Sequence, residues 1–184
     1  KKNRNLSAAV KEKIKSALSR AKGSYREVFV TDYVNWIKYE SQGNFRVTDN
    51  ATDFALDGDG FFAIAYTDKA GNTSVKYSRD GAFVVNTAGY LVTKDGDYVL
   101  NQNGAMNADA GARIQVDPNV PITVDEKGNI FQNNQQVGTI GVVDIADYNY
   151  LAKYGENMYD LVNGGARQAS TAKVTQGCIE SSNI

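Results

Sequence analysis

The chain has 184 residues, 42% of them hydrophobic and 22% charged, and its formal net charge is −1. Nothing in this balance predicts a nucleic-acid partner. Histidine is absent and Cys178 is the single cysteine, which excludes histidine-based catalysis, an internal disulfide and cysteine-based metal sites. We interpret Cys178 as a small, partly buried side chain rather than a reactive thiol.

The first segment, residues 1–42, has a composition of its own. Leu6, Val10, Ile14 and Leu18 recur every four residues before Gly23, which predicts an amphipathic N-terminal helix. Residues 25–39 are rich in aromatic and β-branched side chains and predict extended chain. No apolar run approaches the ~18 residues of a membrane span. No signal peptide is visible, and because the chain starts at Lys1 we expect an excised fragment.

Residues 43–184 predict a single β-rich core. Glycine-containing turns alternate with short apolar stretches at spacings typical of all-β folds. We therefore expect a mainly β fold, an irregular β-sandwich or partial barrel of short antiparallel hairpins. The expected strands are Phe61–Tyr66, Ser74–Ser78, Phe83–Asn86, Leu91–Thr93, Tyr98–Leu100, Ala112–Val116, Ile122–Val124, Asn129–Gln132 and Thr139–Asp144.

Two later stretches are less regular. Residues 148–159 mix apolar and polar side chains and predict a helical turn or a long loop. Residues 164–184 are polar and could not hold a core alone, so we expect them to pack back on the body or to continue into a further segment.

Structural roles are assigned by residue type, because glycine accepts turn geometry and large apolar side chains fill cores. The expected turn residues are Gly58, Gly60, Gly81, Gly89 and Gly96. The expected core residues are Phe54, Phe61, Phe62, Tyr77, Phe83, Leu91 and Val99.

Enzymatic chemistry finds little support. The Asp57–Gly60 turn resembles half a calcium loop, but Ala55 and Tyr66 stand where an EF-hand needs carboxylates. A glycosidase would need two converging carboxylates, for which the candidates are Asp57, Asp59, Asp95 and Asp97. All four belong to turn motifs, where aspartate caps local backbone amides. We therefore assign no catalytic, cofactor-binding or metal-binding residue.

Eleven tyrosines are a high aromatic load. Most are expected to form cross-strand or core contacts. Four lie in the irregular stretch and are the candidates for an exposed interface: Tyr148, Tyr150, Tyr154 and Tyr159. A row of exposed aromatic side chains is also typical of a carbohydrate-binding or adhesive module, so the sequence leaves this function open as an alternative to a purely structural role.

Several motifs resemble those of the bacterial flagellar hook and basal-body rod proteins. They occur in the family's order and cover residues 43–184: Thr52–Ile64, Tyr77–Phe83, Gly89–Thr93, Gly96–Gly104, Ile122–Ile130, Gly155–Tyr159 and Val174–Ile184. Within that family the chain is most similar to the proximal-rod, FlgF-like type, with the distal-rod, FlgG-like type next.

The resemblance implies a structural, non-enzymatic subunit without a cofactor. Such a subunit polymerises with copies of itself and with other rod and hook subunits, because open heterologous contacts build a helical tube. It also implies export by the flagellar type III apparatus and a place in the periplasmic rod, which transmits torque. Family members have long terminal helices, and the resemblance implies a core from which these are missing. No nucleic acid, small-molecule substrate or membrane embedding is expected.

Overall fold

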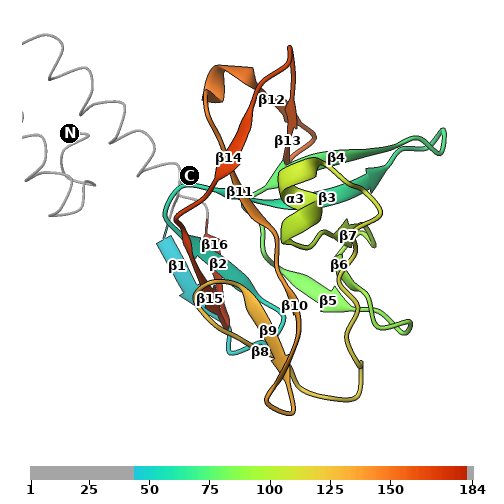
Figure 1. Ribbon diagram of the computed structural model, residues 1–184, viewed down its shortest axis with the longest axis vertical. Helices are drawn as coiled ribbons and strands as arrows, with labels where there is room; N and C mark the ends of the chain where they lie inside the picture. The colour runs from blue at the N-terminus through green and yellow to red at the C-terminus, as the bar shows by residue number, and fades with distance from the viewer. Residues whose placement is uncertain (1–43, 182–184) are drawn as a thin grey trace, which may run out of the picture. The chain divides into compact units, whose positions relative to one another are not determined.

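The computed structural model describes residues 44–181, and Phe45–Glu180 forms one compact unit. The helix expected near the N-terminus and the extended segment at residues 25–39 lie outside the described residues. In the described part the fold is mainly β, built of open antiparallel sheets with one short α-helix (Figure 1).

The largest sheet has nine strands and is organised around β3 (Phe61–Thr67). One edge of β3 pairs with β4 (Thr73–Ser78) from Phe62 to Thr67. The other edge pairs with β7 (Tyr98–Val99) and then with β11 (Val142–Ile145). The sheet is completed by β5 (Phe83–Val85), β6 (Leu91–Thr93), β12 (Leu151–Tyr154), β13 (Met158–Leu161) and β14 (Arg167–Ala169).

Three smaller sheets complete the described chain. They are β1 (Asn44–Val47) with β16 (Cys178–Ser181), β2 (Phe54–Asp57) with β15 (Lys173–Gln176), and β8 (Thr123–Val124) with β9 (Asn129–Gln132) and β10 (Gln135–Thr139). The polar segment after residue 164 therefore returns to the body through β14, β15 and β16, which is one of the two outcomes the sequence left open.

Strand β3 is buried on both faces, so its side chains belong to two hydrophobic cores. Phe62 and Ile64 point into a first core, which also contains Phe54 and Phe83. Phe61, Ala63 and Ala65 point into a second core. A strand that is buried on both faces of its sheet has a continuous apolar sequence rather than an alternating one, and β3 has such a sequence. The second core is bordered by half-buried tyrosines, among them Tyr98, Tyr148 and Tyr159.

The helix α3 (Gln102–Asn107), which begins within the Gly96–Gly104 motif, was not predicted from the sequence. The side chain of Asn101 caps this helix by accepting a hydrogen bond of 2.9 Å from the amide of Gly104. A Cβ on Gly104 would lie 2.8 Å from the Cβ of Ala112, so this glycine serves close packing rather than a hairpin turn.

One expectation is corrected and another is confirmed in part. Ala112–Val116, expected as a strand, is extended chain that makes only isolated bridges to Tyr90 and Leu100. Residues 148–159 contain a helical turn, as one of the two expectations had it, in the 3₁₀ helix η2 (Tyr148–Tyr150). The rest of the stretch is the hairpin β12–β13, which the sequence did not predict. This hairpin lacks strict alternation and gains its order from pairing with β4.

Candidate functional site

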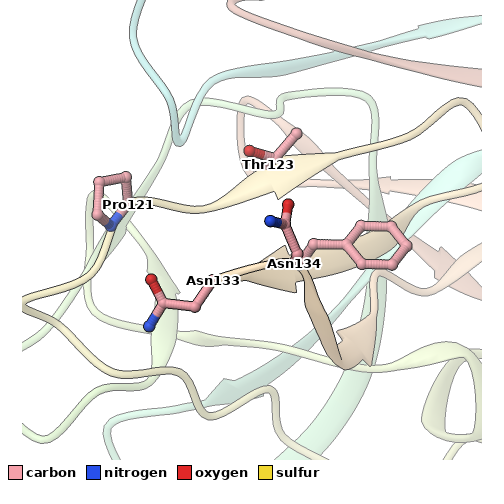
Figure 2. A pocket seen from close by; sticks show the side chains of 5 residues that line it. Pro121, Thr123, Asn133 and Asn134 are labelled. Carbon is pink, nitrogen blue, oxygen red and sulfur yellow. The ribbon is translucent and has the colours of Figure 1, made fainter.

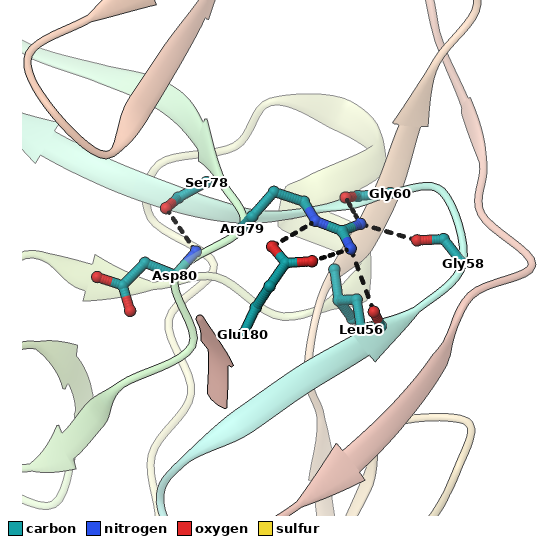
Figure 3. A network of polar contacts seen from close by, with 7 residues as sticks. All are labelled: Leu56, Gly58, Gly60, Ser78, Arg79, Asp80 and Glu180. Atoms are coloured by element: carbon teal, nitrogen blue, oxygen red, sulfur yellow. Dashed lines mark hydrogen bonds and ion pairs between the residues drawn. The ribbon is translucent and has the colours of Figure 1, made fainter. Parts of the chain in front are cut away.

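The side chain of Arg79 lies at the centre of a largely buried polar junction (Figure 3). Its Nη1 donates hydrogen bonds of 2.8 Å to the carbonyl oxygens of both Gly58 and Gly60. Its Nη2 donates to the carbonyl of Leu56 at 3.2 Å and to Glu180 Oε2 at 2.8 Å, and Nε donates to Glu180 Oε1 at 3.2 Å. A guanidinium has five N–H donors, and all five are used.

The turn after β2 aims these carbonyl groups at Arg79. Gly58 and Gly60 have φ angles of 125° and 157°, which L-residues with a Cβ rarely adopt. Space is also limited at Gly60, where a Cβ would lie 2.5 Å from the hydroxyl oxygen of Ser170. The two glycines therefore let the backbone curl so that carbonyls of alternate residues face one cation.

The segment that carries Arg79 is fixed on both sides. The Ser78 hydroxyl donates to the carbonyl of Asn157 at 2.7 Å and accepts from the amide of Asp80 at 3.0 Å. Gly81 then passes against β2, where the amide of Phe54 donates to its carbonyl at 3.0 Å. A Cβ on Gly81 would lie 1.9 Å from the carbonyl oxygen of Phe54, so only glycine fits this crossing.

Strand β16 supplies the acidic partner. The side chains of Glu180 and Arg79 are only 10% and 18% exposed. Burial raises the pKa of the Glu180 carboxyl above its usual value, while the hydrogen bonds and charge of Arg79 act in the opposite direction. The bidentate geometry is the strong form of an arginine–carboxylate pair. Removing one partner of such a partly buried pair lowers the stability of the fold, because the other charge is left buried without a counter-charge.

A second set of bonds fastens the same C-terminal segment. The amide of Gly177 donates to the carbonyl of Asp53 at 2.8 Å. The Gln176 side chain accepts from the amide of Val124 at 3.0 Å and donates to the carbonyl of Ile122 at 3.0 Å. Three stretches that are distant in sequence, around residues 54–60, 78–83 and 176–180, are thus tied at one place.

Sequence reasoning did not single out Arg79, Gln176 or Glu180. All three lie inside the motifs that carried the family resemblance, and Arg79 and Glu180 are of opposite charge in segments otherwise rich in apolar and small residues. The one signal in the sequence that could have suggested the pairing of Arg79 with Glu180 is their opposite charge within two separate family motifs.

The structure places the assigned structural residues as follows. Gly58, Gly60, Gly89 and Gly96 have positive φ angles, whereas Gly81 is required by space alone. All seven assigned core side chains are buried, at 6% exposure or less: Phe54, Phe61, Phe62, Tyr77, Phe83, Leu91 and Val99.

The four candidate interface tyrosines are not equivalent. Tyr148 and Tyr159 both pack edge-on against Phe61, with ring centroids 5.7 Å away. The Tyr148 hydroxyl also donates to Asp144 at 2.7 Å, and burial together with this bond raises the pKa of Tyr148. Tyr154 packs against the Tyr66 ring at 5.3 Å.

Of these four, Tyr150 is exposed at 38%. The other three are half-buried and have intramolecular partners. An interface formed by the four tyrosines stays a prediction.

The four aspartates considered for catalysis lie on two different turns. Asp57, the last residue of β2, and Asp59 flank Gly58 before β3. Asp95 and Asp97 flank Gly96 between β6 and β7. Within residues 44–181 no cluster of three or more histidine, cysteine, aspartate or glutamate side chains could hold a metal ion. No helix in the same part of the chain is long and apolar enough to cross a membrane.

Comparison with known proteins gives two family matches. Residues 55–132 match the flagellar hook protein FlgE/F/G D1 domain, and residues 1–54 match a domain of unknown function, DUF8509. The first match contains the Asp57–Gly60 turn and Arg79, and it ends before β16, which carries Glu180.

Individual relatives extend the similarity over most of the chain. The flagellar basal-body rod protein FlgF of Caulobacter vibrioides is 35% identical over 146 residues, which is 78% of this chain and 55% of the relative. FlgG of Bacillus subtilis is 36% identical over 149 residues, covering 74% and 53%. FlgF of Mesorhizobium japonicum is 34% identical over 154 residues, covering 78% and 56%. The chain spans about half the length of these curated relatives.

Proposed function

We propose that this chain is a structural subunit of the flagellar basal-body rod, because residues 55–132 match the flagellar hook protein FlgE/F/G D1 domain and the rod proteins FlgF and FlgG are 35% and 36% identical to it. It polymerises with copies of itself and with other rod and hook subunits, and the assembled rod transmits torque. Its place is the periplasmic rod, reached through the flagellar type III apparatus.

The observation that carries the proposal is the Arg79 junction. A subunit that transmits torque must resist shear between its own segments, and a close-packed body deforms little under load. The junction joins β2, the start of β3, the end of β4 and β16 through one cation whose donors are all used. A catalytic site keeps its reactive groups accessible to a substrate. Here the Arg79 guanidinium, the Glu180 carboxylate and the backbone carbonyls bond to one another, so the proposed role contains no catalytic step.

The proposal includes the proximal-rod, FlgF-like position. FlgF and FlgG relatives match at nearly equal identity, 35% and 36%, so identity alone does not separate the two positions. Site-specific cross-linking in purified basal bodies distinguishes them, because a proximal subunit cross-links to other rod subunits near the membrane and a distal one to the hook-side end.

The proposed function is tested by deleting the gene in the bacterium that encodes this chain. We expect loss of motility and of complete hook–basal bodies, and restoration of both by the unmodified gene. The tagged protein should co-purify with basal bodies. Normal motility in the deletion strain, together with absence of the tagged protein from basal bodies, would refute the proposal.

A complementing gene with Arg79→Ala sharpens the test. We expect it to give fewer complete basal bodies, because the subunit body is weakened where three segments meet. Arg113→Ala is the matched control, since Arg113 is an exposed arginine stacked on Tyr98 and makes no ion pair within residues 44–181.

A further inference from the structure

A surface hollow of about 500 Å³ lies on the β8–β9 hairpin, away from the Arg79 junction (Figure 2). Its lining consists of Pro121, Thr123, Phe131, Asn133 and Asn134. The figure shows Thr123, which lies on β8, beside Asn134 of the loop after β9, with Asn133 and Pro121 at one side. The hollow thus collects one aromatic ring, one proline and three uncharged polar side chains.

The backbone that holds these residues is well fixed. Thr123 on β8 stands directly opposite Phe131 on β9. Asn133 and Asn134 form the two-residue loop between β9 and β10, with φ angles of 52° and 64°. Asparagine tolerates this left-handed geometry, and two such residues in succession make the tight turn that suits a hairpin. The lining side chains therefore start from a preformed frame.

A buried glutamine anchors the loop that brings Pro121 to the hollow. Gln132 is 7% exposed, and its side chain accepts a hydrogen bond of 3.0 Å from the amide of Asp117. Its Nε2 donates to the carbonyls of Asp117 and Val120, both at 2.9 Å. Preorganisation of this kind lowers the entropy that a ligand must overcome on binding.

The polar groups of the hollow are unused by the fold. Within residues 44–181 the side chains of Thr123, Asn133 and Asn134 make no hydrogen bond. Nearby Asn129 differs, because its side chain bonds to Asp125, Gln136 and Thr139. Phe131 is half-buried, so part of its ring is open to solvent.

We propose that this hollow binds a neutral oligosaccharide. A pyranose ring presents an apolar C–H face that packs on an aromatic ring, and its rim of hydroxyl groups needs uncharged donors and acceptors. Phe131 supplies the platform, and the amides of Asn133 and Asn134 with the Thr123 hydroxyl supply donors and acceptors. Glycan binding here is independent of assembly into a rod.

The lining also argues against other ligand classes. No cation lines the hollow, so a phosphate or a nucleic acid backbone would find no counter-charge. No anion lines it either, so a basic peptide would gain nothing from charge. A single aromatic ring differs from the groove of several aromatics that holds a proline-rich peptide.

The experiment is a titration of the 184-residue chain with two β-1,4-linked tetrasaccharides, one of glucose and one of N-acetylglucosamine, followed by calorimetry and amide NMR shifts. We expect saturable binding with shifts confined to β8, β9 and the 133–134 loop. The N-acetylated sugar should bind more tightly if its acetamido groups meet the two asparagines.

Two variants locate the site. Phe131→Ala should weaken binding about tenfold, the size of a lost aromatic contact. Asn134→Gly keeps the turn geometry and removes one amide, so it should weaken binding while leaving the fold intact. Phe45→Ala, at an exposed phenylalanine on β1, is the control and should not change affinity.

Three outcomes would overturn the proposal. They are no binding of either sugar at millimolar concentration, binding that Asn134→Gly leaves unchanged in a folded protein, and shifts that map to another surface. Binding of a proline-rich peptide in place of both sugars would likewise reject a glycan site. Motility and basal-body assembly of the same variants report on the rod function separately.

Discussion

The Arg79 junction and the hollow on the β8–β9 hairpin differ in whether their polar side chains form hydrogen bonds within the protein. Arg79 uses every donor on partners inside the protein, and its side chain is only 18% exposed. The hollow has three polar side chains that make no hydrogen bond within residues 44–181. Both regions rest on glycine- or asparagine-bearing turns, so turn chemistry alone does not distinguish them. A site that holds the fold together uses its hydrogen-bond donors within the protein, whereas a site that can receive a ligand leaves them unused.

The largest effect should come from breaking the junction. Arg79→Ala leaves the Glu180 carboxylate and three carbonyl groups without their cation, and we expect a loss of about 3–5 kcal/mol in the free energy of unfolding. Arg113→Ala removes an exposed guanidinium that stacks 3.8 Å from the centre of the Tyr98 ring. That control should lose only about 0.5–1 kcal/mol. Urea denaturation of the two variants measures the contrast, and equal losses would contradict it.

Backbone crowding next to the junction gives the second effect. Gly81→Ala would place a Cβ 1.9 Å from the carbonyl oxygen of Phe54, so the two segments must separate. We expect a loss of about 1–3 kcal/mol, as for other overpacked sites. Gly71 is the matched control, because its φ is 90° and a Cβ there meets nothing within 4 Å. Gly71→Ala tests backbone strain alone, and thermal denaturation should show the smaller loss.

A smaller effect should appear in the pH dependence of stability. Burial raises the folded-state pKa of Glu180 above its usual value of 4.5, so the folded state binds this proton more tightly than the unfolded state. The contribution of Glu180 to stability is therefore largest at low pH and declines as the pH rises through the raised pKa. Stability curves of the wild type and of Glu180→Gln should differ in slope in that window, and parallel curves would remove Glu180 as the cause.

The smallest effect is expected in the hollow. Asn134→Gly removes an amide that has no partner within the described residues and keeps a turn that glycine favours. The free energy of unfolding should change by no more than about 0.5 kcal/mol. A loss as large as that of Arg79→Ala would show that the 133–134 loop holds the fold together, and the distinction between the two regions would fail.

Much of the architecture could be predicted because it rests on local signals. The strands from Phe61 to Val99 follow apolar runs between glycine turns, and the structure has β3, β4, β5, β6 and β7 there. The hairpin β12–β13 was missed because its residues do not alternate, and only pairing with β4 orders it. The helix α3 was missed because Asn101 could serve equally as a turn residue or as a helix cap.

The β class and the family motifs could be identified from the amino-acid sequence, and so could the exclusion of histidine-based catalysis and cysteine-based metal sites. Each of these depends on residue type and on spacing over a few residues, which the linear chain displays. The pairing of Arg79 with Glu180 is visible only in the folded chain, because the two residues are 101 positions apart and no local rule specifies a partner at that separation. The tertiary structure also decided which polar groups stay unused, since that depends on how distant segments pack against one another.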